Sequence, residues 1–74
     1  MHSLTIDTRG MSCPLPILKV RKTMRGVSLG TEVLVLATDP AAGDDLRAFC
    51  AVAHCQFLSS ETASDGVLHI LIKK

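Results

Sequence analysis

The segment EVLVLATDPAAGDDLRAFC, residues 32–50, decides the fold, because its hydrophobic pattern changes period half-way along. The run at residues 32–38 is continuous and rich in β-branched side chains, which is typical of a central strand covered on at least one face. From residue 39 the apolar side chains recur at helical spacing. Asp39 suits an N-cap and Pro40 the first helical position, so we predict a helix that ends near His54. Its apolar face would consist of Ala42, Leu46, Phe49, Cys50 and Ala53.

A strand and a helix precede this segment. Polar and apolar residues alternate from Ser3 to Asp7, which predicts a short half-buried strand ended by Thr8, Arg9 and Gly10. A helix is predicted from Pro14 to about Arg25, because apolar residues recur there at helical spacing. These residues are Ile17, Val20 and Met24. Gly26 and the Ser-Leu-Gly turn at 28–30 would close this helix.

Two strands complete the chain, at about residues 56–62 and 67–73, joined by a turn that contains Asp65-Gly66. The predicted order is strand, helix, strand, helix, strand, strand. Two helices packed on one face of a four-stranded sheet would bury these apolar stripes most simply. The sequence therefore predicts an α+β fold.

Length and composition limit the classes of protein. With 74 residues, the chain has room for one small domain with a thin core, which we assign to residues 1–74. No run reaches the ~18 apolar residues that cross a bilayer, and the first ten residues lack the pattern of a signal peptide. Three cysteines are too few to staple a secreted protein. We therefore expect a cytoplasmic protein with reduced thiols and no membrane partner.

Charge is distributed unevenly along the chain. Up to residue 25 basic residues dominate, with only Asp7 opposing them: Arg9, Lys19, Arg21, Lys22 and Arg25. Among the charged residues between 26 and 65, acidic side chains dominate and only Arg47 opposes them: Glu32, Asp39, Asp44, Asp45, Glu61 and Asp65. This pattern fits either two solvated helix faces or a surface that docks partners.

Cys13 stands at the predicted N-terminal boundary of the first helix. The unpaired N–H groups and the dipole of a helix N-terminus favour a negative charge, and cysteines placed there commonly have a lowered pKa. Pro14 and Pro16 fit the first turn, since neither removes a hydrogen bond that this turn would make. We therefore expect a nucleophilic thiol at Cys13. The alternative is an inert small side chain at a helix cap.

The other two cysteines lack an activating pattern, and the sequence offers little support for hydrolysis, thioredoxin-type exchange or zinc binding. Cys50 lies on an apolar helical stripe and is expected in the core, and Cys55 falls at a helix-to-strand junction with no activating pattern. No histidine is placed to act as a base for hydrolysis, and Pro16 occupies the position of a resolving cysteine of the thioredoxin type. Cys50 and His54 lack a second pair to complete a zinc site. A thiol that carries sulfur as a persulfide remains.

The stretch DTRGMSCPLPILKVRKT, residues 7–23, resembles the signature of the TusA/SirA-like sulfur-carrier family, a Cys-Pro-x-Pro motif after a short strand and a glycine, here Gly10. Residues 37–50 resemble the family's second block. The resemblance implies a two-layer α/β sandwich with a mixed four-stranded sheet. It also implies that Cys13 is the active cysteine, with Pro14 and Pro16 as the motif prolines. Where many members have a histidine and an acidic residue after the second helix, this chain has Cys55 and Gln56, and we expect little effect on Cys13.

By this resemblance, Cys13 would receive sulfane sulfur from a cysteine desulfurase or a rhodanese-like donor and pass it to an acceptor protein. The family serves tRNA 2-thiouridine synthesis, molybdenum-cofactor assembly or sulfur oxidation, and all three stay open. We expect Arg9 to favour the anion, and the side chains of Lys19, Arg21, Lys22 and Arg25 to dock partners. We expect a monomeric sulfurtransferase with no metal and no cofactor besides the persulfide sulfur.

The alternative function is a non-catalytic regulator, or a module that binds nucleic acid or protein through its basic first helix. Four basic residues without interleaved aromatic side chains match phosphate backbones poorly, so direct nucleic-acid binding is not expected. Capture of haem or metal by Cys13 would need a further ligand that the spacing does not supply.

Overall fold

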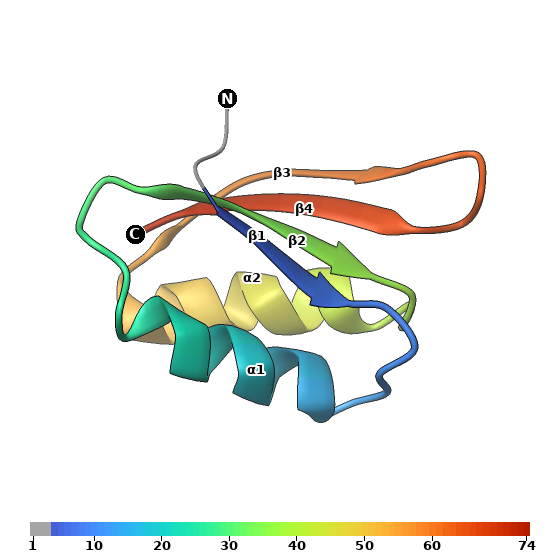
Figure 1. Cartoon of the computed structure of the whole chain (residues 1–74), viewed down its shortest axis with the longest axis horizontal. Helices are drawn as coiled ribbons and strands as arrows, with labels where there is room; N and C mark the ends of the chain where they lie inside the picture. The colour runs from blue at the N-terminus through green and yellow to red at the C-terminus, as the bar shows by residue number, and fades with distance from the viewer. Residues whose placement is uncertain (1–3) are drawn as a thin grey trace.

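Two strand–helix units and a final hairpin make up the chain (Figure 1). The computed structural model describes residues 4–74, so Ser3, predicted to start the first strand, lies outside the described residues. The elements are β1 (Leu4–Thr8), α1 (Leu15–Met24), β2 (Glu32–Ala37), α2 (Ala42–Ala53), β3 (Gln56–Thr62) and β4 (Leu68–Lys73).

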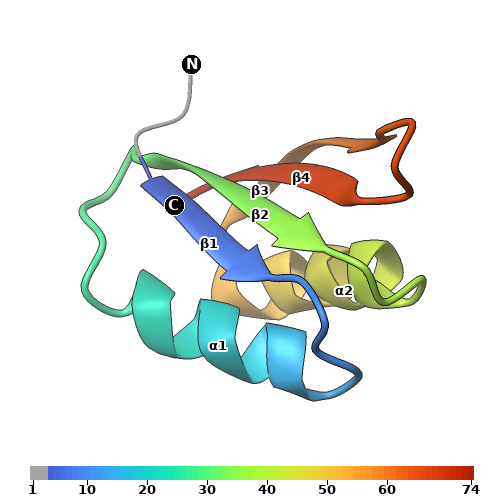
Figure 2. The ribbon, with the colours of Figure 1, turned by 45° about the vertical axis from the view of Figure 1, so that its right-hand side comes forward.

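The four strands form one mixed sheet in the order β1-β2-β4-β3. β1 and β2 are parallel, whereas β4 lies between β2 and β3 and is antiparallel to both. Parallel neighbours require a crossover, and α1 makes it between β1 and β2. Both helices cover the same face of the sheet, as Figure 2 shows. The predicted α+β sandwich, with two helices on one face of a mixed four-stranded sheet, is confirmed.

The core fills the space between this sheet face and the helices. In β2 every second residue is fully buried, namely Val33, Val35 and Ala37, as the period of a strand requires. The other elements add Ile6, Val20, Met24, Ala42, Leu46, Cys50, Ile70 and Ile72. Cys50 is 3% exposed, so its predicted place in the core is confirmed.

The first strand and helix differ from the prediction at their boundaries. Thr8 was predicted to end β1 but belongs to it, because it pairs with Ala37 in the parallel ladder and its buried hydroxyl donates to the Leu36 carbonyl at 2.6 Å. α1 begins at Leu15 rather than at Pro14, which is its N-cap residue. Its buried face includes Pro16, while Ile17 is only partly buried.

α2 begins two residues later than the predicted start at Pro40, and its N-cap residue is Ala41 rather than Asp39. The prediction was wrong because Asp39 forms a separate turn. Its carboxylate Oδ1 accepts from the N–H of Ala41 at 3.0 Å, and its carbonyl accepts from the N–H of Ala42 at 3.0 Å. Pro40 therefore lies inside a turn and not at the first helical position.

The end of α2 agrees better with the prediction. His54 adopts a left-handed conformation with φ of 61° and ends the helix, as expected. Ala53, predicted on the apolar face, is exposed instead. β4 begins at Leu68 rather than at residue 67, because the turn extends one residue past Gly66, which has φ of +85°. The N–H of Val67 donates to the Asp65 carboxylate in this turn.

Candidate active site

Cys13 lies in the loop between β1 and α1, one residue before the N-cap of the helix. Its thiol is free and exposed, and the Cys13–Pro14 peptide bond is cis. Pro14 and Pro16 flank the start of α1, and the carbonyl of Pro14 accepts from the N–H of Leu18 at 3.2 Å. Pro14 is therefore the N-cap residue and Pro16 lies in the first turn, at positions that make no donor bond in a helix.

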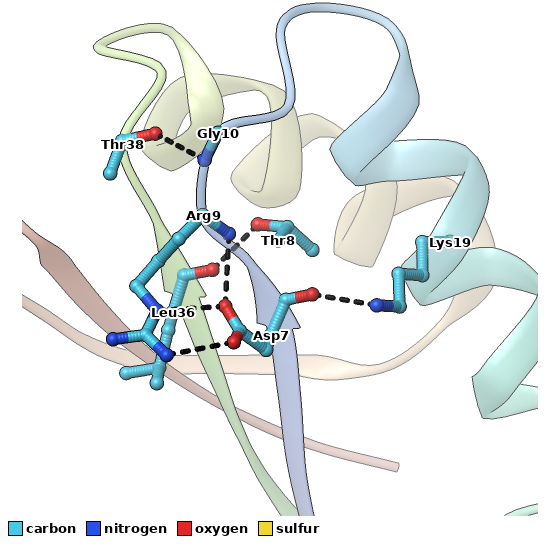
Figure 3. Close-up of polar contacts among 7 residues, drawn as sticks. All are labelled: Asp7, Thr8, Arg9, Gly10, Lys19, Leu36 and Thr38. Carbon is cyan, nitrogen blue, oxygen red and sulfur yellow. Dashed lines mark hydrogen bonds and ion pairs between the residues drawn. The ribbon is translucent and has the colours of Figure 1, made fainter.

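Two hydrogen bonds hold the Cys13 loop against the loop that follows β2. The N–H of Cys13 donates to the Asp39 carboxylate Oδ2 at 2.7 Å, and the N–H of Gly10 donates to Thr38 Oγ1 at 2.9 Å (Figure 3 shows the second). Gly10 has φ of +81°, a conformation that glycine adopts without strain. Because β1 and β2 are parallel, their carboxyl ends meet at one edge of the sheet and bring these loops together.

Asp39 thus has a role that its sequence position did not reveal. One carboxylate oxygen orders the turn before α2, and the other fixes the backbone of the candidate nucleophile. From its sequence position, Asp39 is expected only to cap a helix. This role would have been predictable from a parallel pairing of the first two strands, because that pairing places the residues after each strand side by side.

The electrostatics at the sulfur oppose the expected activation. The pKa of Cys13 is raised, first by partial desolvation and then by the Asp45 carboxylate, which acts through its charge and as a hydrogen-bond acceptor for the thiol. The charge of Asp39 acts in the same direction. The predicted lowering of the pKa is therefore wrong for the isolated chain, because the acidic start of α2 faces the thiol.

Arg9 was expected to favour the thiolate but is bound to Asp7 (Figure 3). Its Nε lies 2.9 Å from Asp7 Oδ1 and its Nη2 lies 2.9 Å from Oδ2, and its backbone N–H also donates to Oδ1. This pairing lowers the pKa of Asp7 to about 2. The guanidinium therefore stabilises the end of β1 rather than a charge on Cys13.

A shallow groove runs between α1 and α2 and begins at Cys13. Its first part has a volume of about 370 Å³ and is lined by Cys13, Pro14, Ile17, Asp45, Ala48, Phe49 and Val52. Its second part, of about 470 Å³, shares Ile17, Phe49 and Val52 with the first and extends to Cys55. The candidate nucleophile therefore opens onto an apolar surface rather than into an enclosed cavity.

The four basic residues predicted to dock partners lie in different surroundings, and their role in docking stays a prediction. Arg21 and Arg25 line the far part of the groove together with Lys74. Lys19 donates through Nζ to the Asp7 carbonyl at 2.7 Å and so joins α1 to β1 (Figure 3). Lys22 is exposed on α1 and does not line either part of the groove.

Comparison with known families adds the decisive observation. The family model described as sulfurtransferase TusA matches residues 4–74. The chain belongs to the TusA sulfurtransferase family. The resemblance seen in the Cys-Pro-x-Pro stretch is thereby confirmed, and a role in sulfur transfer follows for the chain as a TusA-family protein.

The TusA-family fold is also seen in a solved structure. A crystal structure of a SirA-like protein from Desulfitobacterium hafniense matches with a TM-score of 0.84 and 24% identity, covering 96% of each chain. This likeness concerns the fold. Within residues 4–74 no helix is long and apolar enough to cross a membrane.

Members of the TusA family work in sulfur relays between donor and acceptor proteins. Such a protein needs a nucleophile that two partners can reach in turn. In this chain the thiol of Cys13 is exposed and borders the groove, and the Cys13 backbone N–H donates to Asp39.

Proposed function

We propose that this protein carries sulfane sulfur as a persulfide on Cys13. It takes the sulfur from a cysteine desulfurase or a rhodanese-like donor and passes it to an acceptor protein. The observation that carries the proposal is the exposed thiol of Cys13, fixed at the meeting point of two loops, in a chain that matches the TusA family over residues 4–74.

The transfer has the form of a thiol–disulfide exchange. The Cys13 thiolate attacks the terminal sulfur of the donor's persulfide, a new S–S bond forms on Cys13, and the donor's S–S bond breaks to release its thiolate. Loading requires the Cys13 thiol to lose its proton, which the Asp45 carboxylate opposes, and the proton ends on the thiolate that the donor releases. Delivery repeats the exchange, with the acceptor's thiolate attacking the outer sulfur of the Cys13 persulfide.

The surroundings of Cys13 favour recognition by proteins. An enclosed pocket would suit a small substrate, whereas this thiol borders an open apolar groove. Large apolar side chains are exposed close to the groove and the motif: Val52 is 80% exposed and Leu15 is 52% exposed. Exposed apolar side chains next to a reactive group are typical of surfaces that bind protein partners.

The proposed setting is a monomer in a reducing cytoplasm, where Cys13 stays a free thiol between transfers. Three downstream routes agree with it, namely tRNA 2-thiolation, molybdenum-cofactor assembly and sulfur oxidation. Transfer from loaded protein to a purified acceptor of each route distinguishes them.

The proposal is tested by loading with labelled sulfur. The protein is incubated with a cysteine desulfurase and cysteine that carries radioactive sulfur, and bound label is measured under non-reducing conditions, with and without a reductant. We expect reducible label on the wild type and on the Cys55→Ser variant, but none on Cys13→Ser. A rhodanese with labelled thiosulfate serves as the second donor. Equal label on Cys13→Ser with either donor would overturn the proposal.

A further inference from the structure

A second pair of sulfur atoms lies at the other end of the groove. The thiols of Cys50 and Cys55 form a hydrogen bond with 2.7 Å between their sulfur atoms. Cys50 lies in the last turns of α2 and Cys55 just before β3, where these two elements meet (Figure 1). Neither cysteine has a part in the transfer proposed for Cys13.

The turn that ends α2 creates this contact. His54 is left-handed, and the carbonyl of Cys50 accepts from the N–H groups of both His54 and Cys55, the latter at 3.1 Å. In such a helix ending, two side chains five residues apart in sequence frequently come into contact, one from the last helical turn and one just after the left-handed residue. Here these two residues are Cys50 and Cys55, so the backbone itself brings their sulfur atoms together.

The two thiols differ in their access to solvent. Cys50 is 3% exposed, and burial together with the contact to Cys55 raises the pKa of its thiol to about 12. Cys55 is partly exposed and lines the far part of the groove. A reagent in the groove therefore meets Cys55 first and reaches Cys50 only through it.

The groove beside Cys55 is positively charged at its rim. Arg21, Arg25 and Lys74 line it together with apolar side chains from both helices. The far part has a volume of about 470 Å³, which is within the range of sites that hold small molecules. Anionic reagents are favoured next to these three cations.

We propose that Cys50 and Cys55 form a dithiol site, separate from Cys13, that small anionic disulfides oxidise to an intramolecular disulfide. Cys55 is the attacking thiol and Cys50 the resolving thiol. A disulfide has an S–S length of ~2.05 Å, so the sulfurs at 2.7 Å need to approach by well under an ångström. The inference goes beyond the sulfur-carrier function and does not depend on it.

The reaction balances in two exchanges. The Cys55 thiolate attacks one sulfur of the reagent disulfide, which forms a mixed disulfide on Cys55 and releases the first reagent thiolate. Cys50 then attacks the Cys55 sulfur, which forms the Cys50–Cys55 bond and releases the second thiolate. The protons of the two protein thiols end on the two reagent thiols, so the protein loses two electrons and the reagent gains them.

The test uses glutathione disulfide, whose net charge at neutral pH is negative, on the Cys13→Ser variant. Trypsin cleaves after Arg47 and Lys73, so one fragment, residues 48–73, carries both cysteines of the proposed site. We expect this fragment to become lighter by two hydrogen atoms, with no glutathione attached, and to return to its original mass with a reductant. A lasting glutathione adduct, or a fragment unchanged while Cys13 of the wild type reacts, would overturn the proposal.

Matched variants separate the two roles, each in the Cys13→Ser background. In Cys50→Ala the glutathione adduct should remain on Cys55, because no resolving thiol is present. In Cys55→Ala the buried Cys50 should not react.

Exchange of both Arg21 and Arg25 for glutamate should slow oxidation by glutathione disulfide several-fold and speed oxidation by cystamine, a cationic disulfide. Equal rates in all arms would contradict the assigned role of the basic rim. Since Cys13 is absent throughout, these results are independent of sulfur loading.

Discussion

The surroundings of Cys13 raise the pKa of its thiol in the isolated protein. Partial desolvation is the largest cause, and the carboxylates of Asp45 and Asp39 act in the same direction. The resting thiol is therefore protonated at neutral pH, and it becomes a nucleophile when a partner supplies positive charge or removes the proton. A carrier with this property reacts slowly with small molecules between transfers.

Replacing Asp45 with asparagine should lower the pKa of Cys13, because a negative charge that disfavours the thiolate is removed. We expect alkylation by iodoacetamide at neutral pH to become faster by a few-fold, and the midpoint of its pH profile to move down. Asp44→Asn is the control, since Asp44 lies in the same helical turn but is not among the groups that shift the thiol. An unchanged midpoint in Asp45→Asn would show that this carboxylate does not act on Cys13.

The Asp7–Arg9 ion pair predicts how the stability of the protein changes at acid pH. Its effect holds the pKa of Asp7 at about 2, below the ordinary value of 3.8. A lowered carboxyl pKa contributes stability that is present above the ordinary value and is lost as the pH falls toward 2. Asp7→Asn should therefore destabilise the protein at pH 7 and lose this effect near pH 2. In an NMR titration the Asp7 midpoint should rise toward 3.8 in Arg9→Ala, and a wild-type midpoint already at 3.8 would refute the pairing.

At the scale of elements, the edge where β1 and β2 end is the part of the fold that builds the site. The parallel pairing of the strands places one loop with Cys13 beside another with Asp39. The same arrangement points the acidic first turn of α2 at the thiol. Changes at this edge should therefore affect stability and reactivity together.

Asp39→Ala removes the acceptor for the N–H groups of Cys13 and Ala41. We expect a loss of about 1–2 kcal/mol in the free energy of unfolding, as measured by urea denaturation. Sulfur loading should also slow, although the thiol is intact, because the Cys13 backbone is no longer fixed. Asp44→Ala, an exposed position in the same region, should change stability less. Equal stability of Asp39→Ala and the wild type would show that the carboxylate does not join the loops.

Much at this scale was predictable from the sequence. The period change at residues 32–50 and the two terminal strands gave the element order correctly, because these patterns are local. The start of α2 was misplaced because Asp39 orders a separate turn before the helix, and its second carboxylate oxygen bonds to a backbone group 26 residues away in sequence. Thr8 was misassigned for a related reason, since its place in β1 depends on pairing with β2. Long-range contacts of this kind leave no local periodicity.

At the scale of the whole molecule, one thin layer of side chains holds the sheet to its helices. Leu46 is fully buried at the centre of this layer. Leu46→Ala should reduce the free energy of unfolding by about 2–5 kcal/mol, which is a large part of the stability of a domain this small. Val52→Ala, on the same helix but 80% exposed, should change it by less than about 0.5 kcal/mol. Similar denaturation midpoints for the two variants would contradict the core described above.

The molecule as a whole also explains why its three thiols differ. Cys13 is exposed at one end of the groove, Cys55 lines the other end, and Cys50 is buried behind Cys55. The sequence predicted that Cys50 lies in the core, which is confirmed, whereas the role of Cys13 as the nucleophile stays a prediction. It did not reveal the contact between Cys50 and Cys55, which arises from the left-handed turn at His54. The sequence signal for this contact was the position of two cysteines, one before and one after the residue that ends the helix.

The position of the transferred sulfur decides whether Cys13 is the carrier. After incubation with a cysteine desulfurase and cysteine, the protein is digested without reductant, and the mass of the tryptic fragment 10–19, which carries Cys13, is compared with that of fragment 48–73. We predict one added sulfur atom on fragment 10–19, and none on this fragment in Cys13→Ser. Added sulfur on fragment 48–73 alone, or on Cys13→Ser as on the wild type, would contradict it.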